Sequence, residues 1–459
     1  MIKKKNATDF RLDLDWKPGF ARSAEIQYAT DKTGTFKAIL QILPDKVNCV
    51  LRAADSDHVL KCEDAALENG ITILKRGNYM RALFGGKDLW LQGGTGEWAG
   101  NYMQRENDLI ISCEHGSLSR CDYYPLPWLK PADTPAIAAG TEGSYMEQQV
   151  LPGAILEDNG KYYMYTMCGL KGEEEGSSYR QVGLAVSDDL EHWEVGAEPL
   201  IKIGDLNIPH DNLYVDGCLR RDDGKIVLLM TVQVFPKWVG MCAFLADQPE
   251  GPFTAYEGNP IIKPDVIFHE FDVVKCDLPQ GKYMLYLSRF CAGQGDRGVR
   301  YFSNDMLSWK KDEDESTMLK PQTENGWDSI HVRPRSITRI GDYWYFFYEG
   351  TNHWKPELYN QTTNGFVNQE WWDTIGLART TDFHNWEYYP MNPCLNPQGI
   401  SIARFDGRWT GWPRMVIKDG TCYVFYSASG EKVNVGLRKV ALADLIDWNS
   451  ELTGKESLI

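Results

Sequence analysis

The sequence predicts an all-β protein, a five-bladed β-propeller preceded by a β-sandwich domain. Three observations lead to this prediction. A turn followed by an aromatic or aliphatic strand recurs five times after residue 145, as GKYYMYTM, GKIVLLMT, GKYMLYLS, GDYWYFFY and GTCYVFYS. A second marker, a strand that runs through a polar turn into an aromatic residue, follows each copy. Residues 1–121 consist instead of short alternating segments between turn residues, without a helical period of useful length.

The composition excludes several classes of protein. The chain has 459 residues, a formal net charge of −16 and a pI near 5.1, and an acidic surface repels phosphate backbones, so we expect no nucleic-acid partner. The opening MIKKKNATDF lacks the apolar core of a secretory signal, and no apolar run reaches the roughly 18 residues that a membrane span needs. The 11 cysteines show no CxxC spacing, which favours free thiols in a reducing, cytoplasmic compartment and no metal site.

The first domain is predicted from regularly spaced short strands, which are typical of a β-sandwich. Its role is left open between a carbohydrate-binding module and a scaffold that packs against the rest of the chain. Residues 122–144 are rich in Pro, Ala and Gly and predict an extended linker. The strand-like segments are 10–14, 24–28, 35–42, 47–53, 71–75, 79–84, 88–92 and 109–113.

The propeller is predicted over residues 145–459. Both markers recur at intervals of roughly 60 residues, which is the size of a four-stranded blade. Five such units close a ring whose first strands line a central channel, whereas an open array would leave unprotected sheet edges. The fourth interval of the glycine-turn marker is longer than its others, which predicts an insertion at about 351–372, rich in Asn, Gln and Trp.

The stretch HVRPRSITRIGDYWYFFYE, residues 331–349, indicates how a repeat carries functional groups. A Gly-Asp turn separates its two strands, as in a β-hairpin. The hairpin brings its two ends side by side, so His331, Arg333 and Arg335 lie next to Glu349. One end of the unit is therefore polar, while its body belongs to the core.

Candidate pocket residues follow from the position of the channel mouth. Counting eight residues back from each turn glycine gives Pro152, Asp216, Val273 with Asp272 before it, Arg333 and Trp412. Apolar strands alone have no need of such charged groups, so we expect an axial pocket there. Polar residues near these positions add Glu147, His210, Asp211, Glu270, His331, Arg335 and Arg414.

With these features the sequence resembles the five-bladed propeller glycoside hydrolases, as in families 32, 43, 62, 68, 117 and 130. The resemblance rests on the pieces SDDLEHW, SNDMLSW and TTDFHNW, on the G-K/D-x-Y strands and on acidic residues at the starts of inner strands, and it covers about residues 147–448. It implies cleavage of a glycosidic bond by carboxyl groups. One group protonates the leaving oxygen, and the other attacks the anomeric carbon or activates water.

Transferred by position, the resemblance implies Asp216, Asp272 and Glu349 as catalytic carboxylates, with Glu270 as a rival to Asp272. Arg333 and Arg335 would hold hydroxyl groups. The first repeat departs from the pattern because it reads Leu-Pro at 151–152 where many relatives carry Asp-Pro. The roles of the individual carboxylates therefore stay open.

The function predicted on this basis is a glycoside hydrolase that acts on an oligosaccharide, for example an arabinofuranoside or a fructofuranoside. No cofactor is expected, and a structural Ca²⁺ in the channel, as in some relatives, is left open. One alternative is a glycoside phosphorylase, in which Arg333, Arg335 and Arg414 would bind phosphate. The other is a non-catalytic glycan-binding propeller, which the missing first-repeat Asp makes conceivable.

Overall fold

The structure, a computed structural model, describes residues 1–30, 34–53, 56–64, 70–77, 79–92, 106–129, 132–171, 178–205, 208–234, 237–263, 270–291, 295–322, 326–351, 359–360, 365–366, 374–397, 405–407 and 409–459. Within these ranges it is nearly all β, with one short helix, α1 (Leu442–Ile446), and two 3-10 turns (Glu315–Thr317 and Ser450–Leu452). None of the described helices is long and apolar enough to cross a membrane.

Two six-stranded sheets make up the N-terminal part of the described chain. The first has the order β1 (Ile2–Ala7), β10 (Asn107–Cys113), β3 (Ala24–Thr30), β4 (Phe36–Ile42), β5 (Lys46–Ala53) and β6 (Ser56–Asp64). The second has the order β33 (Glu456–Ser457), β11 (Leu118–Pro125), β2 (Phe10–Trp16), β7 (Ile71–Arg76), β8 (Tyr79–Phe84) and β9 (Lys87–Gln92).

The two sheets share one hydrophobic core. Alternate residues such as Leu12 and Leu14 from β2 meet Ile26 and Leu40 from the other sheet, and all four are buried. Every strand-like segment predicted for residues 1–113 is a strand here. The sequence did not reveal β1 and β6, because both are polar edge strands of the first sheet and lack the apolar alternation of an inner strand.

Five consecutive antiparallel repeats follow in the described chain. Repeat 1 contains β12 (Gln149–Asp158), β13 (Lys161–Lys171), β14 (Ser178–Ser187) and β15 (Glu194–Val195), and repeat 2 contains β16 (Asn212–Arg220), β17 (Ile226–Val234), β18 (Lys237–Ala246) and β19 (Thr254–Ala255). Repeat 3 contains β20 (Phe271–Leu278), β21 (Gly281–Cys291), β22 (Gly295–Ser303) and β23 (Lys310–Lys311). Repeat 4 contains β24 (His331–Ile340), β25 (Tyr343–Thr351), β28 (Thr374–Thr380) and β29 (Glu387–Tyr388), and repeat 5 contains β30 (Trp409–Lys418), β31 (Thr421–Ser429) and β32 (Val433–Ala441).

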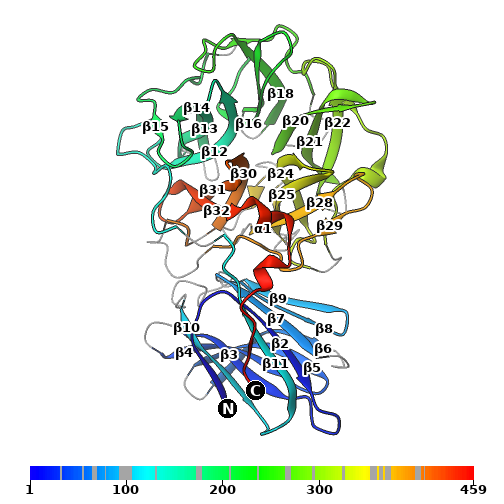
Figure 1. The fold of residues 1–459 in the computed structure, drawn as a ribbon. Helices are drawn as coiled ribbons and strands as arrows, with labels where there is room; N and C mark the ends of the chain where they lie inside the picture. The colour runs from blue at the N-terminus through cyan, green and yellow to red at the C-terminus, as the bar shows by residue number, and fades with distance from the viewer. Residues whose placement is uncertain are drawn as a thin grey trace.

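The repeats are arranged in a circle. Figure 1 shows repeat 1 on the left, repeat 2 at the top, repeat 3 on the right and repeats 4 and 5 below. The first strand of each repeat contacts the first strand of the next, and β30 contacts β12, so the five first strands surround one axis. We call the end of the axis at which these strands begin the leading end, and the end at which the glycine turns lie the turn end.

The ring is closed by a segment that precedes it. In repeats 1 to 4 the third strand pairs at one point with a residue that follows it, as Val182 pairs with Ile201. In repeat 5 the equivalent Val435 pairs with Ile137, which comes before repeat 1. The stretch predicted as a linker, 122–144, therefore takes part in the outer edge of repeat 5.

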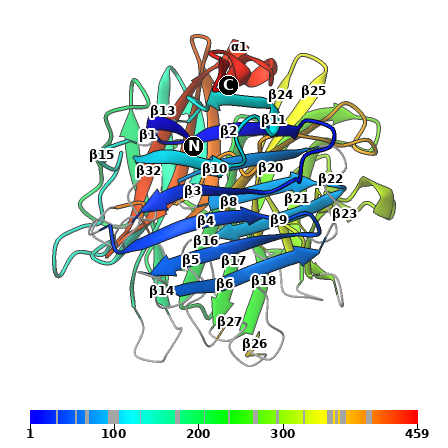
Figure 2. The same ribbon diagram turned by 90° about the horizontal axis from the view of Figure 1, so that it is seen from below.

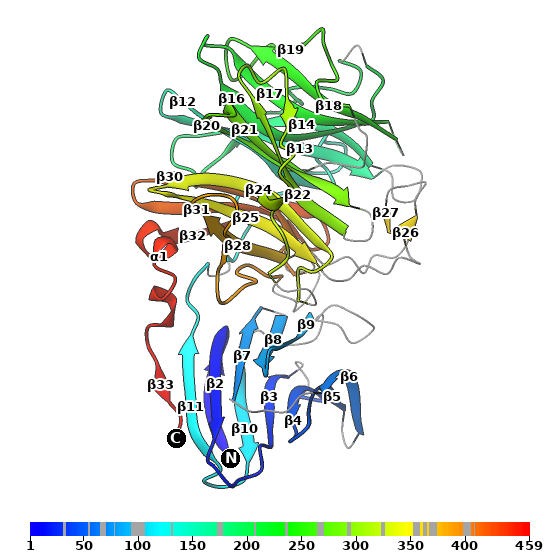
Figure 3. The same ribbon diagram turned by 90° about the vertical axis from the view of Figure 1, so that its right-hand side faces the viewer.

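The boundary predicted at residue 121 falls within β11, which continues to Pro125. The C-terminal strand β33 returns to pair with β11 in the second N-terminal sheet, whereas β1 lies at the edge of the first. Seen from below, the strands of the two N-terminal sheets lie in front of the repeats (Figure 2), and in the side view the last residues descend from α1 to β33 (Figure 3). The predicted insertion at 351–372 contains two short strands, β26 (Tyr359–Asn360) and β27 (Gly365–Phe366), and Trp354, Trp371 and Trp372 lie outside the described residues.

The repeated S/T-x-D motif forms a turn after the third strand. In the first copy Leu190 donates its backbone N–H to the Ser187 hydroxyl at 2.9 Å, and His192 donates its own to Asp189 at 2.8 Å. The copies that begin at Ser303 and Thr380 make the same contacts. These hydroxyls and carboxylates satisfy backbone groups of the turn, so this part of the resemblance is structural.

Candidate active site

The side chains near the axis are positioned by β-bulges. In β16 the pairing with β17 shifts between Val215 and Gly217, which leaves Asp216 as the extra residue. In β24 the shift lies between Pro334 and Ser336, and Arg335 is the extra residue. A bulge turns its extra residue out of the normal alternation. The sequence thereby directs one acidic side chain from repeat 2 and one basic side chain from repeat 4 toward each other across the axis.

Arg335 is the centre of the cluster. Its Nη1 lies 3.0 Å from Asp216 Oδ1, its Nη2 lies 3.0 Å from Glu270 Oε1, and its Nε donates to Glu349 Oε1 at 3.2 Å. All four side chains are fully buried. The guanidinium also lies over the Trp412 ring at 4.2 Å, a cation–π contact. One arginine therefore collects carboxylates from repeats 2, 3 and 4.

Arg333 extends the cluster toward the leading end. Its Nε donates to Asp296 Oδ2 at 2.8 Å and lies 3.2 Å from Glu270 Oε2, and its Nη1 is 3.9 Å from Glu349 Oε2. His331 Nδ1 is 2.7 Å from the same Asp296 oxygen. Asp296 was not predicted from the sequence, because it lies in β22, the third strand of repeat 3, and the counting concerned first strands. At this point β22 lies parallel to β24, with Asp296 opposite His331.

Arg414 links the cluster to the backbone. Its Nη2 donates to Asp216 Oδ1, and its Nη1 donates to the carbonyl oxygens of Phe271, at 3.1 Å, and Arg335. Burial lowers the pKa of Arg414 from its ordinary value, against the charge of Asp216. The second carboxylate oxygen of Asp216 has no hydrogen-bond partner among the described residues.

The formal charges of the cluster do not cancel. Four carboxylates, those of Asp216, Glu270, Asp296 and Glu349, face the three guanidinium groups of the arginines just described. Buried charges are retained only where they are paired, so the surplus of one negative charge favours one bound proton, held by a carboxyl group or by His331, whose Nδ1 lies 2.7 Å from Asp296 Oδ2. A proton shared among close carboxylates is what general acid catalysis requires.

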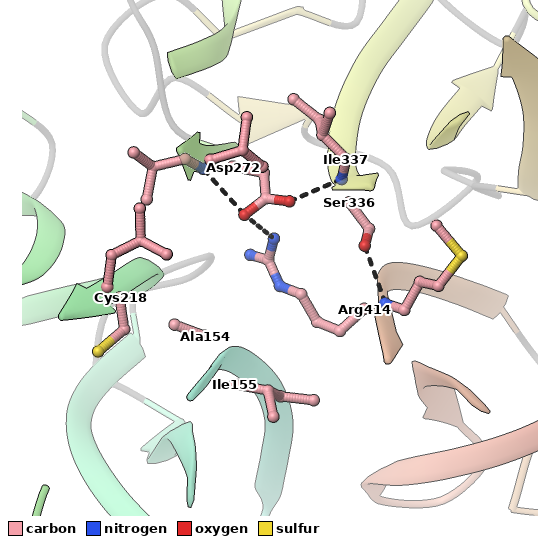
Figure 4. A pocket seen from close by; sticks show the side chains of 11 residues that line it. Ala154, Ile155, Cys218, Asp272, Ser336, Ile337 and Arg414 are labelled. Atoms are coloured by element: carbon pink, nitrogen blue, oxygen red, sulfur yellow. Dashed lines mark hydrogen bonds and ion pairs between the residues drawn. The ribbon is translucent and has the colours of Figure 1, made fainter. Parts of the chain in front are cut away.

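Asp272 lies apart from this group. Strand β20 has no bulge at this level, so Asp272 pairs regularly with Tyr286. In the register of the repeats its position corresponds to Gly217 and Ser336, which directly follow the bulge residues Asp216 and Arg335. It lines a cavity of about 180 Å³ on the turn side of the cluster, to which all five first strands contribute. Figure 4 shows the guanidinium of Arg414 pointing at the Asp272 carboxylate, and the two groups approach to 4.0 Å.

The oxygens of Asp272 are used by the backbone. Oδ2 accepts the N–H of Ile337 at 2.7 Å and Oδ1 accepts the N–H of Val273 at 2.9 Å (Figure 4). Ser336 does the same one repeat further, because its hydroxyl accepts the N–H of Met415 at 2.8 Å. First strands of neighbouring repeats do not pair with each other along their length, so these side chains satisfy backbone groups that a sheet would otherwise satisfy.

Burial raises the pKa of Asp272 to about 7, although Arg414 and the two backbone donors act in the opposite direction. Such a carboxyl changes its charge near neutral pH. That property is frequent in active sites, but a cross-link between strands produces it equally well.

Three predicted site residues lie away from the cluster in local structure. Glu147 accepts the backbone N–H of Gly143 at 2.7 Å. His210 accepts the N–H of Gly204 at 3.0 Å through Nε2 and lies 2.7 Å from the Ile208 carbonyl through Nδ1. Asp211 is partly exposed and starts the pairing of β16, since its N–H donates to the Gln233 carbonyl at 3.0 Å. The other predicted substrate-binding residues are in the cluster: Glu270, His331, Arg333, Arg335, Trp412 and Arg414.

A signal in the second strands supports Glu349. In repeat 4, Glu349 of the second strand pairs with Arg333 of the first strand. The equivalent second-strand positions of the other repeats hold small hydroxyl residues, namely Thr166, Thr231, Ser288 and Ser427. A carboxylate at a position that is otherwise a small hydroxyl residue is the kind of departure that marks a special role. No group of three His, Cys, Asp or Glu residues with the arrangement of a metal site occurs in the described ranges.

Comparison with known proteins shows the fold. No family model and no curated protein matches the sequence. Solved structures do match, including a candidate glycosidase from Bacteroides thetaiotaomicron, with 13% identity, a TM-score of 0.52 and coverage of 68% of this chain and 96% of the other. A glycosyl hydrolase from Bacteroides ovatus has 12% identity and a TM-score of 0.52, with coverage of 68% and 93%.

A third match comes from the family 130 of mannoside phosphorylases, which contains glycoside hydrolases that target β-1,2-mannosidic linkages in Candida mannan. It has 12% identity and a TM-score of 0.51, with coverage of 68% of this chain and 93% of the other. At these identities the likeness concerns the fold alone. The resemblance to the propeller glycosidases, stated above from the repeats, is confirmed at that level.

Proposed function

We propose that this protein is a glycoside hydrolase that acts on an oligosaccharide at the leading end of the axis. The observation that carries the proposal is the convergence on Arg335 of Asp216, Glu270 and Glu349, from three repeats. Carboxyl groups that come from different strands around one axis can stand on both sides of a sugar. The shared fold of glycosidases and family 130 enzymes supports the same class of activity.

The chemistry requires one protonated and one ionised carboxyl group. In the proposed site the arginines keep most of the carboxylates charged, and the surplus carboxylate holds the proton that goes to the leaving oxygen. We assign these roles within the set of Asp216, Glu270 and Glu349. Asp272 is left out of the reacting set, because its two oxygens bind backbone N–H groups of β20 and β24.

A neutral sugar fits this site better than phosphate does. Arg333, Arg335 and Arg414, the candidates for a phosphate subsite, are each engaged by at least one carboxylate. A phosphate dianion would add charge to a cluster in which carboxylates already outnumber guanidinium groups. We therefore propose hydrolysis, with water and not phosphate as the acceptor, and a furanoside such as an arabinofuranosyl or fructofuranosyl unit as the first substrate class to examine.

The same reasoning extends to the architecture. We propose that the five repeats over residues 145–459 are the blades of one propeller, since their first strands follow each other around an axis and the Ile137 bridge closes the circle. The two N-terminal sheets, over residues 1–121 with the rest of β11 and the returning strand β33, would form a β-sandwich domain, since they share one core.

The test is activity on a panel of 4-nitrophenyl glycosides and neutral oligosaccharides, with and without inorganic phosphate. Replacement of Glu349 by Gln keeps its shape and removes its charge, and we expect a loss of about 10²-fold or more in kcat/KM. Glu387→Gln, at an exposed residue of the same repeat that pairs with Arg379, is the matched control and should retain full activity. Product formation that depends on phosphate, or an active Glu349→Gln variant, would contradict the proposal.

A further inference from the structure

The turn that joins β7 and β8 carries the N-terminal sheets into contact with the ring. We call residue 77 and residues 79–81, which lead from this turn into β8, the docking hairpin. Arg81 is 1% exposed. Its Nε and Nη2 bind both oxygens of Asp88, at 2.8 and 2.7 Å, and its Nη1 donates to the carbonyl of Asn392 at 2.8 Å. An arginine buried between two parts of the chain fixes their relative position, because its planar donors allow little variation in angle.

Asn392, whose carbonyl accepts the Arg81 bond, is itself bound to repeat 4 through its side chain. Its side chain is fully buried, and it accepts the N–H of Leu377 and donates to the Leu377 carbonyl, both at 2.9 Å. Its Nδ2 also lies 3.4 Å from the hydroxyl of Tyr348. The amide is thereby bonded to β28 and reaches β25, the strand that carries Glu349.

Tyr348 connects β25 to the segment in front of β24. Its hydroxyl donates to Asp328 Oδ2 at 2.9 Å, and both oxygens of Asp328 accept the N–H of Gln322, at 3.2 and 3.0 Å. Asp328 is completely buried, and burial raises its pKa to about 6 although the hydrogen bonds and the charge of Arg81 lower it. Asp328 belongs to residues 326–330, the clamped segment, which ends immediately before His331.

The clamped segment has little room to move. A Cβ on Gly350 would lie 2.4 Å from the Trp327 ring and 2.7 Å from Asp328, and Trp327 also stacks with Tyr348 at a centroid distance of 5.7 Å. On the other side, Arg297 donates to the carbonyls of Ser329 and Ile330, at 3.1 and 2.9 Å. Close packing of this kind transmits a displacement instead of absorbing it.

We propose that the docking hairpin is a positioning element for the active site, and that Arg81 holds the clamped segment, and with it His331 and Arg333, in register with Glu349. The catalytic part of this inference rests on the proposed function, whereas the structural part does not. The N-terminal sheets would then serve the site from the rim of the ring without touching substrate. Arg81 is accordingly a positioning residue.

The structural part is tested by hydrogen exchange of the full-length protein, read out by mass spectrometry on peptides that span residues 326–333. Arg81→Lys keeps the charge but loses the forked contacts, and the double variant Arg81→Met with Asp88→Leu removes both charges without leaving one buried and alone. We expect at least fivefold faster exchange in these peptides in both variants. The matched control is Arg76→Lys, at the end of β7 just before the docking hairpin, because the Arg76 guanidinium binds Glu451 and the Trp128 carbonyl instead of Asn392.

Unchanged exchange in both Arg81 variants, or an equal increase in Arg76→Lys, would overturn the inference. The catalytic part is read from kinetics on the same proteins. A positioning role predicts a tenfold or greater fall in kcat with KM within twofold for Arg81→Lys, and wild-type kcat for Arg76→Lys. If the wild-type protein cleaves no glycan, the proposed function fails while the exchange experiment still decides the role of the hairpin. If activity is present and Arg81→Lys leaves kcat unchanged, the positioning inference fails alone.

Discussion

Replacement of Asp272 by Asn separates a catalytic from a structural role for the residue that the sequence placed in the active site. The carboxylate is 18% exposed and binds two backbone N–H groups, and its pKa is raised to about 7 from an ordinary value of 3.8. Asn has a single oxygen and cannot change its charge. The variant therefore loses one hydrogen bond, which costs about 1 kcal/mol, and also the pH dependence that the carboxyl group contributes.

The sign of that dependence follows from the direction of the shift. Because the pKa in the folded protein is higher than in the unfolded chain, the folded state binds more protons between these values, and stability falls as the pH rises toward 7. For a shift of this size the contribution of Asp272 decreases by about 2.6 kcal/mol between pH 5 and pH 8. Wild type should therefore exceed Asp272→Asn in stability by about 1 kcal/mol at pH 5, and the order should reverse at pH 8, because the difference changes by about 2.6 kcal/mol.

The assay is urea-induced unfolding at pH 5, 6, 7 and 8, followed by activity at pH 6. Asp305→Asn is the control: burial raises the pKa of Asp305, but the N–H groups of Leu307 and Ser308 outweigh it and keep the pKa low, so its effect should not vary over this range. We expect Asp272→Asn to keep kcat within tenfold of wild type. A loss of 10²-fold or more, typical of a missing general acid or base, together with a stability difference that is constant with pH, would refute this reasoning.

Three further outcomes are expected. Arg335→Met should lower the free energy of unfolding by about 3–5 kcal/mol in a denaturant titration, because it leaves three buried carboxylates without their shared partner. Gly350→Ala should cost about 1–3 kcal/mol by overpacking against Trp327, whereas Gly196→Ala, with its nearest atom at 3.4 Å, should unfold with the wild type. Trp128→Ala, which removes a ring stacked on repeat 4, should cost about 3–5 kcal/mol and expose the junction with the N-terminal sheets to limited proteolysis.

Much of the fold could be predicted because its signals are local. Alternation and turn glycines lie within a few residues of each other, so the strands of the N-terminal sheets and the five repeats were recognisable one at a time. The closing contacts were not, because they join residues far apart in the chain. Nothing in the sequence near Ile137 indicates that it pairs with Val435, or that the last residues return to β11.

The site residues also fall into those that the sequence predicted and those that it did not. Asp216 and Arg333 were located by counting back from the turn glycines, and Arg335 and Glu349 from the two ends of the 331–349 hairpin; the structure brings all four together. Asp296 was missed because it comes from a third strand. Glu147, His210 and Asp211 were included because they are near a first strand in sequence, yet each serves a local turn or a strand start.

Asp272 shows why counting residues along the chain does not fix where a side chain lies. In the chain it stands two residues after Glu270, just as Asp216 stands two after Tyr214 and Arg335 two after Arg333. The difference is a bulge at this level, which β16 and β24 have, whereas the pairing of β20 shifts only later, between Lys275 and Leu278. The extra residue in β16 directs the Asp216 side chain toward Arg335. Without such a residue, the Asp272 carboxylate of β20 lies nearer the turn end and faces the cavity there. Glu270, which adopts a left-handed backbone conformation with φ 75°, supplies the carboxylate of repeat 3 in its place.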